Sequence, residues 1–169
     1  MLNIPEYDIE TITTNNSSKF ADIFYSNDRY YSLVEGRCVT DDVILGTVNY
    51  CPKGFEKDNV KIIGISKNGV PVALLSHLEH YPKNGISWLG LLLVHKNNQG
   101  QGVGTKIVEA LVKWAAEHGF YAMQLSVQDN NLSAVEFWQD VGFSIIDKTP
   151  GVVAGVEFMN LTMERGLHI

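Results

Sequence analysis

Three glycines at alternate positions form the sequence feature that most constrains this chain. The segment Gln99–Gly104 reads Gln-Gly-Gln-Gly-Val-Gly and lies between an apolar run, Ile86–Val94, and an amphipathic stretch that begins at Val103. Backbone without side chains can approach a ligand closely, and a helix start presents unpaired N–H groups and a positive dipole end. The segment therefore predicts a buried strand, a phosphate-binding loop and a helix in succession.

Two familiar phosphate-binding loops differ from this segment in their spacing. A Walker loop needs Gly-Lys followed by Ser or Thr, whereas Gly104-Thr105-Lys106 has another order. The dinucleotide fingerprint has two residues between its second and third glycines, and here there is one. Asp129 stands about where a ribose-binding acid would lie, so a nucleotide-binding oxidoreductase fragment stays open as an alternative.

The residues before the loop predict antiparallel strands. The runs Val60–Ser66 and Val70–His80 are joined at Asn68-Gly69, a pair typical of tight hairpins because both turn residues need positive φ. A second such pair, Asn84-Gly85, is expected to turn the chain into Ile86–Val94. That last run is nearly all apolar, as expected of a central strand covered on both faces, and a glycine inside it, Gly90, suggests a bulge.

The residues after the loop alternate between helical and strand patterns. One apolar stripe predicts a helix that Gly119 ends, and Glu109 and Lys113 are spaced as an ion pair on its exposed side. The later elements are a strand at Tyr121–Val127, a helix opened by a capping box at Ser133-Ala134-Val135-Glu136 and stopped by Gly142, and strands at Phe143–Lys148 and Glu157–Glu164 that Thr149–Gly155 joins. We therefore expect a single α/β domain over residues 1–169, with a mixed sheet of antiparallel N-terminal strands and a parallel pair.

The N-terminal third is less regular in pattern. Tyr7–Thr13 alternates weakly as an edge strand would, and Ser17–Asp28 is expected to form a short helix. Residues 29–59 contain scattered tyrosines, glycines and a proline, which favours irregular structure. The tyrosines Tyr25, Tyr30 and Tyr31 are candidates for the wall of a substrate site.

Charge and cysteine content exclude several classes of function. The formal net charge is −6 without a basic cluster, so neither nucleic acid nor an anionic membrane is an expected partner. The two cysteines, Cys38 and Cys51, form no CxxC pair and are expected to be reduced thiols. Met1–Glu10 has no signal-peptide pattern, and the longest apolar stretch, Trp88–Val94, is too short to span a bilayer. These features together predict a cytoplasmic protein.

Two motifs carry a family resemblance. The spacing Gln99-x-x-Gly102-x-Gly104 resembles the acetyl-CoA-binding motif of the GNAT superfamily of N-acetyltransferases, and Asn131-x-x-Ala134 followed by Gly142-Phe143 is similar to that family's second motif. Both occur in the family's order on the expected elements. The resemblance implies the GNAT fold, in which helices cover both faces of the sheet and the parallel pair is splayed.

The resemblance also implies a cofactor site. Backbone N–H groups of Gln101–Gly104 would bind the pyrophosphate of CoA, and Leu92–Val94 would pair with the pantetheine arm as an added strand does. Asn131 would reach the cofactor from the opposite wall. The cofactor-binding residues implied are Leu92, Leu93, Val94, Gln99, Gly100, Gln101, Gly102, Val103, Gly104, Thr105, Asn131 and Ala134.

The reaction implied is transfer of the acetyl group of acetyl-CoA, without a metal, to a primary amine that attacks the thioester directly in a ternary complex. Backbone N–H groups of Leu91–Leu93 would steady the oxyanion. The acceptor would be a small molecule or a peptide, and the enzyme a monomer or a homodimer. A catalytically inactive acyl-CoA-binding module is a second alternative, because Ile86–Val94 contains no carboxylate and Trp138 stands where the family usually has a tyrosine.

Three residues are candidates for catalysis. An indole N–H donates a hydrogen bond but is no usable acid, so Trp138 cannot protonate the departing thiolate as the usual tyrosine would. Glu79 is the expected general base, directly or through a water, and His77 on the same strand face is its rival. His77 and His80 point to opposite faces of their strand, so they are not expected to share a metal ion.

Overall fold

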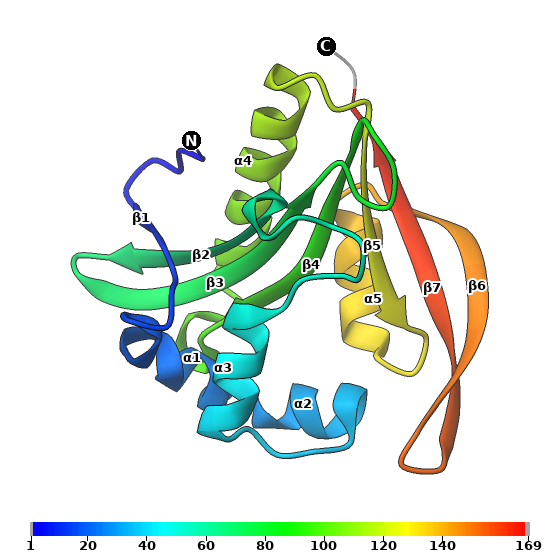
Figure 1. Ribbon diagram of the computed structural model, residues 1–169, viewed down its shortest axis with the longest axis horizontal. Helices are drawn as coiled ribbons and strands as arrows, with labels where there is room; N and C mark the ends of the chain where they lie inside the picture. Colours follow the sequence, from blue (N-terminus) through cyan, green and yellow to red (C-terminus); the bar gives the residue numbers. More distant parts are fainter. Residues whose placement is uncertain (1, 168–169) are drawn as a thin grey trace.

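Residues 2–167, the part that the structure describes, form a seven-stranded sheet in the order β1-β2-β3-β4-β5-β7-β6 in this computed structural model (Figure 1). The strands are β1 Asp8–Thr11, β2 Val60–Lys67, β3 Val70–Glu79, β4 Ile86–Val94, β5 Ala122–Gln128, β6 Ser144–Val153 and β7 Val156–Gly166. The α-helices are α1 Ala21–Ser26, α2 Asp28–Glu35, α3 Asp41–Asn49, α4 Val103–Glu117 and α5 Leu132–Asp140, and short 3-10 turns lie at Ser17–Phe20, Lys57–Asn59 and Lys96–Asn98.

The first four strands are antiparallel neighbours, as the sequence predicts. The β2–β3 hairpin turns at Asn68 and Gly69, whose φ angles of 51° and 78° are the positive values that a two-residue turn needs. The next connection differs from the expectation. Gly85 has φ of 82°, but Asn84 is not in the positive region, and the chain needs His80–Gly85 to pass from β3 to β4. A longer loop therefore replaces the expected tight turn.

The sheet opens between its two parallel strands, β4 and β5. Their pairing covers only Ile86 with Ala122, Ser87 with Met123 and Trp88 with Gln124. Directly after this contact, Gly90 is extra in β4, because Leu89 pairs with His77 and Leu91 with Ser76. The bulge expected at Gly90 is thus present, and beyond it β4 follows β3 while β5 follows β7.

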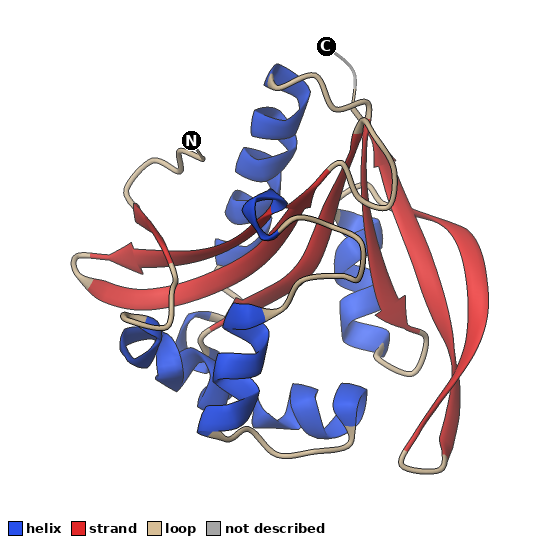
Figure 2. Cartoon of the chain, viewed as in Figure 1, coloured by secondary structure: helices blue, strands red, loops and turns tan. Residues whose placement is uncertain are grey.

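Helices cover both faces of the sheet (Figure 2). Alternate residues of β3 enter different cores: Ala73 and Leu75 pack with α4 and α5, whereas Leu74 packs with α1 and α3. The apolar stripe of α4 comprises Val103, Ile107, Leu111, Trp114 and Ala115, all buried or half-buried on the sheet. This arrangement matches the fold expected from the sequence.

The irregular structure expected over residues 29–59 is wrong. The segment contains two helices, α2 and α3, separated by a turn at Gly36 with φ of 66°. Thr40 caps α3, since its hydroxyl accepts the N–H of Val43 at 3.4 Å, and Asp41 and Asp42 lie favourably in the first turn. The helices have only eight and nine residues, so a helical pattern repeats too few times to be recognised in the sequence.

Two smaller expectations near the C-terminus are also corrected. The capping residue of α5 is Asn131, so Ser133 lies inside the helix and forms no capping box. The segment Thr149–Gly155 is not a loop, because β6 and β7 pair as far as Val153 and Val156. The turn consists of Ala154 and Gly155, both with positive φ, and the hairpin therefore projects beyond the rest of the sheet (Figure 1).

Candidate active site

A cleft of about 1240 Å³ occupies the opening between β4 and β5. One wall is the run Leu89–Val94 of β4, and the opposite wall is Leu125–Gln128 of β5. The glycine loop and the start of α4 close one end, α5 contributes Phe137 and Trp138, and α2 borders the remaining side. The splayed strands thus provide a site whose walls come from residues far apart in the sequence.

The glycine loop forms an open cradle at this end. Gly100 and Gly102 have φ angles of 71° and 77°, and a Cβ atom at either position would meet no other atom within 4 Å. Gly102 is the N-cap residue of α4, and no side chain caps the helix. The first N–H groups of α4 therefore point into free space, an arrangement that suits the oxygens of a pyrophosphate.

Gly104 differs from Gly100 and Gly102 because it packs against another helix. A Cβ atom there would lie 3.2 Å from the ring of Phe137, so its absence allows α4 and α5 to approach closely. Gln101 does not line the cleft; its side-chain amide donates instead to the Asn97 carbonyl at 2.8 Å. The other cofactor-binding residues expected from the sequence line the cleft: Leu92, Leu93, Val94, Gln99, Gly100, Gly102, Val103, Gly104, Thr105, Asn131 and Ala134.

A group of hydrogen bonds joins the connection between α1 and α2 to the end of β4. The Asn27 side-chain amide donates to the Val94 carbonyl at 3.0 Å. Gln99 donates to the same carbonyl at 2.9 Å and to Asn27 Oδ1 at 3.1 Å. The backbone N–H of Lys96 donates to Ser26 Oγ at 3.2 Å. The glutamine of the glycine loop thus fastens the loop to the first helices.

The far end of α2 is held by β5. Gln128 Nε2 donates to the Val34 carbonyl in the last turn of α2 at 2.9 Å. The turn after α2 packs on the tip of the C-terminal hairpin, since a Cβ atom on Gly36 would lie 2.9 Å from Val153 and 3.2 Å from Ala154. Asn27 and Val34 therefore connect α2 to the ends of both splayed strands, and the helix lies across the open end of the cleft (Figure 1).

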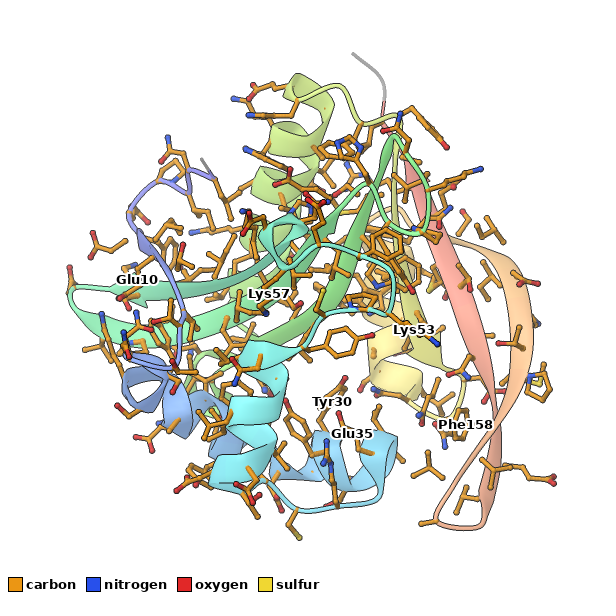
Figure 3. All side chains as sticks on the ribbon, in the orientation of Figure 1. Glu10, Tyr30, Glu35, Lys53, Lys57 and Phe158 are labelled. Atoms are coloured by element: carbon orange, nitrogen blue, oxygen red, sulfur yellow. The ribbon has the colours of Figure 1, made fainter. Side chains whose placement is uncertain are left out.

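Of the three tyrosines expected at a substrate site, one lines the cleft. Tyr30 projects from α2 into it, half-buried (Figure 3). Burial, together with a smaller effect of the Glu35 carboxylate, raises the pKa of Tyr30 to about 12, so its hydroxyl is a hydrogen-bond donor at neutral pH. Tyr31 is buried in the core, and the exposed Tyr25 donates to Asp41 at 2.6 Å.

The charges on the cleft wall are positive. Within residues 2–167, the lining includes Arg29 and Lys96 but no aspartate, glutamate or histidine. Lys96 lies at the end that holds the glycine loop, whereas Arg29 lies in the first turn of α2. The described wall therefore favours anionic groups, such as a phosphate beside the glycine loop.

Trp138 lies where the sequence places it, on the cleft wall. Its ring forms edge contacts with Phe137 at 4.8 Å and Phe143 at 5.6 Å between ring centroids. The aromatic group fixes the position of the indole from the α5 side. Trp138 thus contributes a rigid apolar surface to the cleft.

Neither expected base reaches the cleft. Glu79, at the end of β3, pairs with Ser87, which lies in the short stretch where β4 and β5 are still joined. His77 is 2% exposed and faces α4, with Nε2 at 2.7 Å from Ser87 Oγ and its ring against Trp114 at 5.1 Å. The catalytic roles of Glu79 and His77 stay predictions, and their placement argues against both.

The environment of His77 disfavours its protonated form. Burial, together with a smaller effect of the Lys61 charge, lowers the pKa of His77 from 6.5 to about 4. The neutral ring packs among the aromatic side chains of Trp114 and Phe120. His77 therefore belongs to the core beneath α4 rather than to the site.

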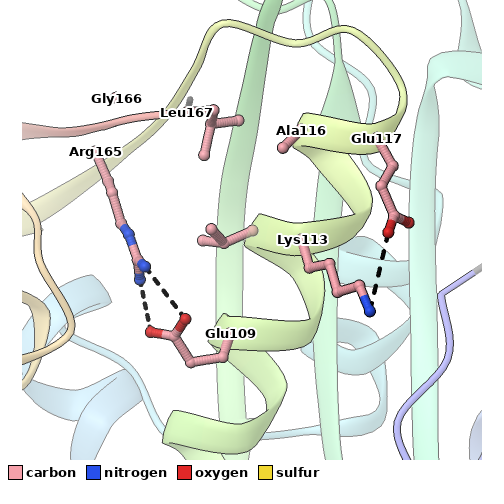
Figure 4. Close-up of a pocket in the computed structure, with 8 residues that line it drawn as sticks. Glu109, Lys113, Ala116, Glu117, Arg165, Gly166 and Leu167 are labelled. Atoms are coloured by element: carbon pink, nitrogen blue, oxygen red, sulfur yellow. Dashed lines mark hydrogen bonds and ion pairs between the residues drawn. The ribbon is translucent and has the colours of Figure 1, made fainter. Parts of the chain in front are cut away.

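A second cavity of about 460 Å³ lies between α4 and the end of β7 (Figure 4). Two ion pairs border it: Arg165 with Glu109 at 2.7 Å, and Lys113 with Glu117 at 3.9 Å. The expected pair of Glu109 with Lys113 is thus replaced by a bidentate contact to β7. The opposite charges within each ion pair compensate one another. No residue of the glycine loop lines this cavity.

Comparisons with known proteins agree on one family. The model of the acetyltransferase (GNAT) family matches residues 4–143. A spermine/spermidine N(1)-acetyltransferase of Bacillus subtilis (strain 168) is 28% identical over 138 residues, which are 80% of this chain and 86% of that protein. The chain therefore spans most of this relative's length.

Solved structures share the fold. An acetyltransferase from Thermus thermophilus has a TM-score of 0.78 with 20% identity, over 97% of this chain and 99% of that one. An acetyltransferase from Salmonella typhimurium, solved with its cofactor acetyl-CoA, has a TM-score of 0.68 with 18% identity, over 96% of this chain and 95% of that one.

Among residues 2–167, no helix combines the length and apolar character needed to cross a membrane. That same range contains no group of three or more His, Cys, Asp or Glu side chains placed to hold a metal ion.

Proposed function

The chain belongs to the acetyltransferase (GNAT) family and is an acetyl-CoA-dependent N-acetyltransferase, and on that premise we propose that it acetylates a primary amine by direct attack in a ternary complex. The observation that carries this proposal is the cleft between β4 and β5, which ends in the uncapped start of α4. A cofactor bound there at one end leaves the other end, beside α2 and the end of β5, for the acceptor.

The glycine loop would hold the pyrophosphate of the cofactor. The open space at Gly100 and Gly102 and the free N–H groups at the start of α4 fit phosphate oxygens. Thr105 lines the same end, and the positive charge of Lys96 lies nearby on the wall. Bound acetyl-CoA supplies an activated thioester, and these residues of the chain fix its position.

The inner edge of β4 would receive the pantetheine arm. The N–H of His95 is bonded to Val72 of β3 at 2.8 Å, so the peptide groups of Val94 and, two residues earlier, Leu92 face the cleft instead. The Val94 carbonyl already accepts from Asn27 and Gln99. The N–H of Val94 and the peptide groups near Leu92 are therefore the positions where an added strand would pair.

Attack requires a neutral amine. An alkylamine has a pKa near 10.4, so at pH 7 about one molecule in a thousand carries the free electron pair. Since the described lining has no carboxylate or imidazole, the amine would lose its proton to water before or during entry. Within the Leu91–Leu93 segment the N–H of Leu92 faces the cleft and would stabilise the oxyanion, and the thiolate would leave without an acid from Trp138.

The relatives give coarse support for an amine acceptor. The Bacillus subtilis relative is named for spermine and spermidine, both of which are alkylamines. An identity of 28% leaves the acceptor of this chain open. The oxidoreductase alternative loses its basis, because the glycine loop lies within the segment that the family model matches.

Turnover across amine classes tests the proposal. The purified protein would be mixed with acetyl-CoA and a panel of monoamines, polyamines, amino acids, aminoglycosides and peptides, and release of free thiol would be followed. We expect amine-dependent thiol release together with an acetylated product of the added mass by mass spectrometry. Tight binding of acetyl-CoA by calorimetry without turnover of any amine would contradict the proposal.

A further inference from the structure

The acceptor end of the cleft lies where α2 meets the end of β5. Val34 of α2 accepts the hydrogen bond from Gln128, and the cleft wall continues through Asn130 and Asn160. Tyr30 reaches the same region from the preceding turn of α2 (Figure 3). The polar groups at this end are therefore amides, the Tyr30 phenol, the Ser126 hydroxyl and the Arg29 guanidinium, in contrast with the glycine loop at the other end.

Gln128 lines this part of the cleft and has a side-chain oxygen without a hydrogen-bond partner among residues 2–167. Its side chain is 7% exposed, and the Val34 carbonyl, which can only accept, fixes the NH₂ group on the α2 side. The oxygen Oε1 is buried and has no partner among residues 2–167. A buried acceptor without a donor is unfavourable, so a ligand that brings an N–H would be bound there.

A second amide oxygen on the same wall has the same property. Asn130 Oδ1 is buried and lacks a partner within the described chain. A neutral primary amine has two N–H donors and one electron pair. If amide oxygens accept its N–H groups, the electron pair stays free for the thioester.

The acids next in sequence to lining residues are engaged elsewhere. Asp28 accepts the N–H of Val39 at 2.7 Å, and Asp129 accepts that of Met159 at 2.9 Å. The Glu35 carboxylate accepts a hydrogen bond from the Arg37 guanidinium at 2.7 Å. No carboxylate is thus left on the described wall to balance a second ammonium group, and burial of an unpaired charge is costly.

We propose, on the basis of the function proposed above, that the acceptor is a primary amine with a neutral or anionic remainder, that Gln128 Oε1 binds its N–H, and that polycationic amines are poor substrates. Arg29 lies on the same face of α2 as Tyr30 and Leu33 and makes no ion pair with the described acidic side chains. It adds attraction for an anionic remainder and repulsion for a cationic one.

Three amines of equal length test the choice of substrate. Pentylamine, 5-aminopentanoate and 1,4-diaminobutane share the same H₂N–(CH₂)₄ chain and differ only in a terminal methyl, carboxylate or ammonium group. We expect kcat/KM for the diamine to be at least about tenfold below that of the better of the other two. A diamine used as well as or better than both would overturn this inference and leave the acetyltransferase function intact. Turnover of other amines but none of these three would do the same, whereas no turnover of any amine would contradict the proposed function itself.

Two variants test Gln128. Gln128→Met keeps the side-chain length but removes the acceptor oxygen, and should raise the KM for the amine about tenfold while leaving the KM for acetyl-CoA unchanged. Gln128→Glu supplies the missing carboxylate and should shift the preference toward the diamine. Gln124→Met is the matched control, because Gln124 is also buried in β5, at 8% exposure, but donates to Glu164 outside the cleft.

The control decides whether the effect is specific. Equal changes of amine KM in Gln128→Met and Gln124→Met, or a loss of melting temperature in Gln128→Met with no change in amine KM, would show that Gln128 only stabilises the fold. An unchanged ranking of the three amines in Gln128→Glu would also count against the proposal.

Discussion

Asn27 and Val94, which are 67 residues apart in the sequence, are joined by a hydrogen bond of 3.0 Å from the asparagine side chain to the valine carbonyl. Gln99 donates to the same carbonyl and also to Asn27. The three residues belong to the α1–α2 connection, to β4 and to the glycine loop, respectively. They therefore make the position of the glycine loop depend on α2, which lines the cleft.

Removal of the Asn27 side chain should loosen the cofactor site. In Asn27→Ala the Val94 carbonyl keeps only the bond from Gln99, and Gln99 loses one acceptor. We expect the KM for acetyl-CoA to rise about tenfold, because about two hydrogen bonds of roughly 1 kcal/mol each are lost. Asn16→Ala is the control, since Asn16 bonds to Glu10 and Thr11 far from the cleft. Equal KM values in the two variants would contradict this coupling.

Gly102→Asp tests the glycine loop. An aspartate there would place a negative charge beside the phosphate oxygens, at a position that its carboxylate can cap. We expect acetyl-CoA binding to weaken by about 10²-fold or more, measured by calorimetry. Gly119→Asp is a matched control at the opposite end of α4, with φ of 81° against 77° at Gly102. Unchanged affinity in a folded Gly102→Asp protein would disprove the assignment of this loop.

Trp138 should act through its shape. Trp138→Phe keeps an aromatic ring beside Phe137 and Phe143 but loses the indole N–H. Since an indole cannot donate a proton to a thiolate, most of kcat should remain. Steady-state kinetics would reveal a mistaken assignment as a fall in kcat of about 10²-fold with acetyl-CoA affinity preserved.

The variant Glu79→Gln tests whether Glu79 is the general base, as the sequence predicts, or has no catalytic role, as its position outside the cleft indicates. A general base contributes about 10²- to 10⁴-fold, so a catalytic Glu79 would be plainly visible in kcat/KM and in the acidic limb of the pH profile. Because Glu79 pairs with Ser87 outside the cleft, we expect both to stay near the wild-type values. A loss in that range, with the acidic limb removed, would establish Glu79 as the base after all.

His77 should make the fold sensitive to acid. Its pKa is lowered from 6.5 to about 4 in the folded protein, so between these values the unfolded chain binds the proton more strongly. The stability contributed by neutral His77 is fully present above pH 6.5 and decreases as the pH falls toward 4. At about 1.4 kcal/mol per pKa unit, the total is on the order of 3 kcal/mol.

Urea unfolding followed by tryptophan fluorescence would measure this dependence between pH 7.5 and 4.5. His77→Gln should flatten the slope, whereas His80→Gln, at the exposed end of the same strand, should leave it unchanged. Identical slopes for wild type and His77→Gln would mean that other groups cause the acid sensitivity.

The sequence predicted the parts of the fold that depend on local signals. Asn68-Gly69 demands positive φ at both positions, and Gln99–Gly104 stands between a strand and a helix with strong periodicity, so both were identified correctly. Helices α2 and α3 were missed, because eight or nine residues give few repeats of a helical pattern. Thr40 followed by two aspartates was the available start signal.

Local sequence signals could not predict the side of the cleft that α2 and the end of β5 form. The contacts of Asn27 with Val94 and of Gln128 with Val34 join residues 67 and 94 positions apart, and no spacing rule connects them. Glu79 is the nearest carboxylate in the strand before Ile86–Val94, and in the structure it pairs with Ser87. Its distance from the cleft depended instead on where β4 and β5 separate, which only the three-dimensional structure reveals.

A sheet that parts in its middle has four edges instead of two. The inner rows of N–H and C=O groups on β4 and β5 could pair with a strand of another molecule, as unprotected edges do when proteins aggregate. Helix α2 crosses this opening and is attached to both rims through Asn27 and Gln128. We therefore expect a doubly substituted Asn27→Ala, Gln128→Met protein to scatter more light on storage than either single variant, and saturating acetyl-CoA to suppress the excess. Bound acetyl-CoA would then prevent association of two copies by occupying the strand edge where a strand of a second molecule could pair.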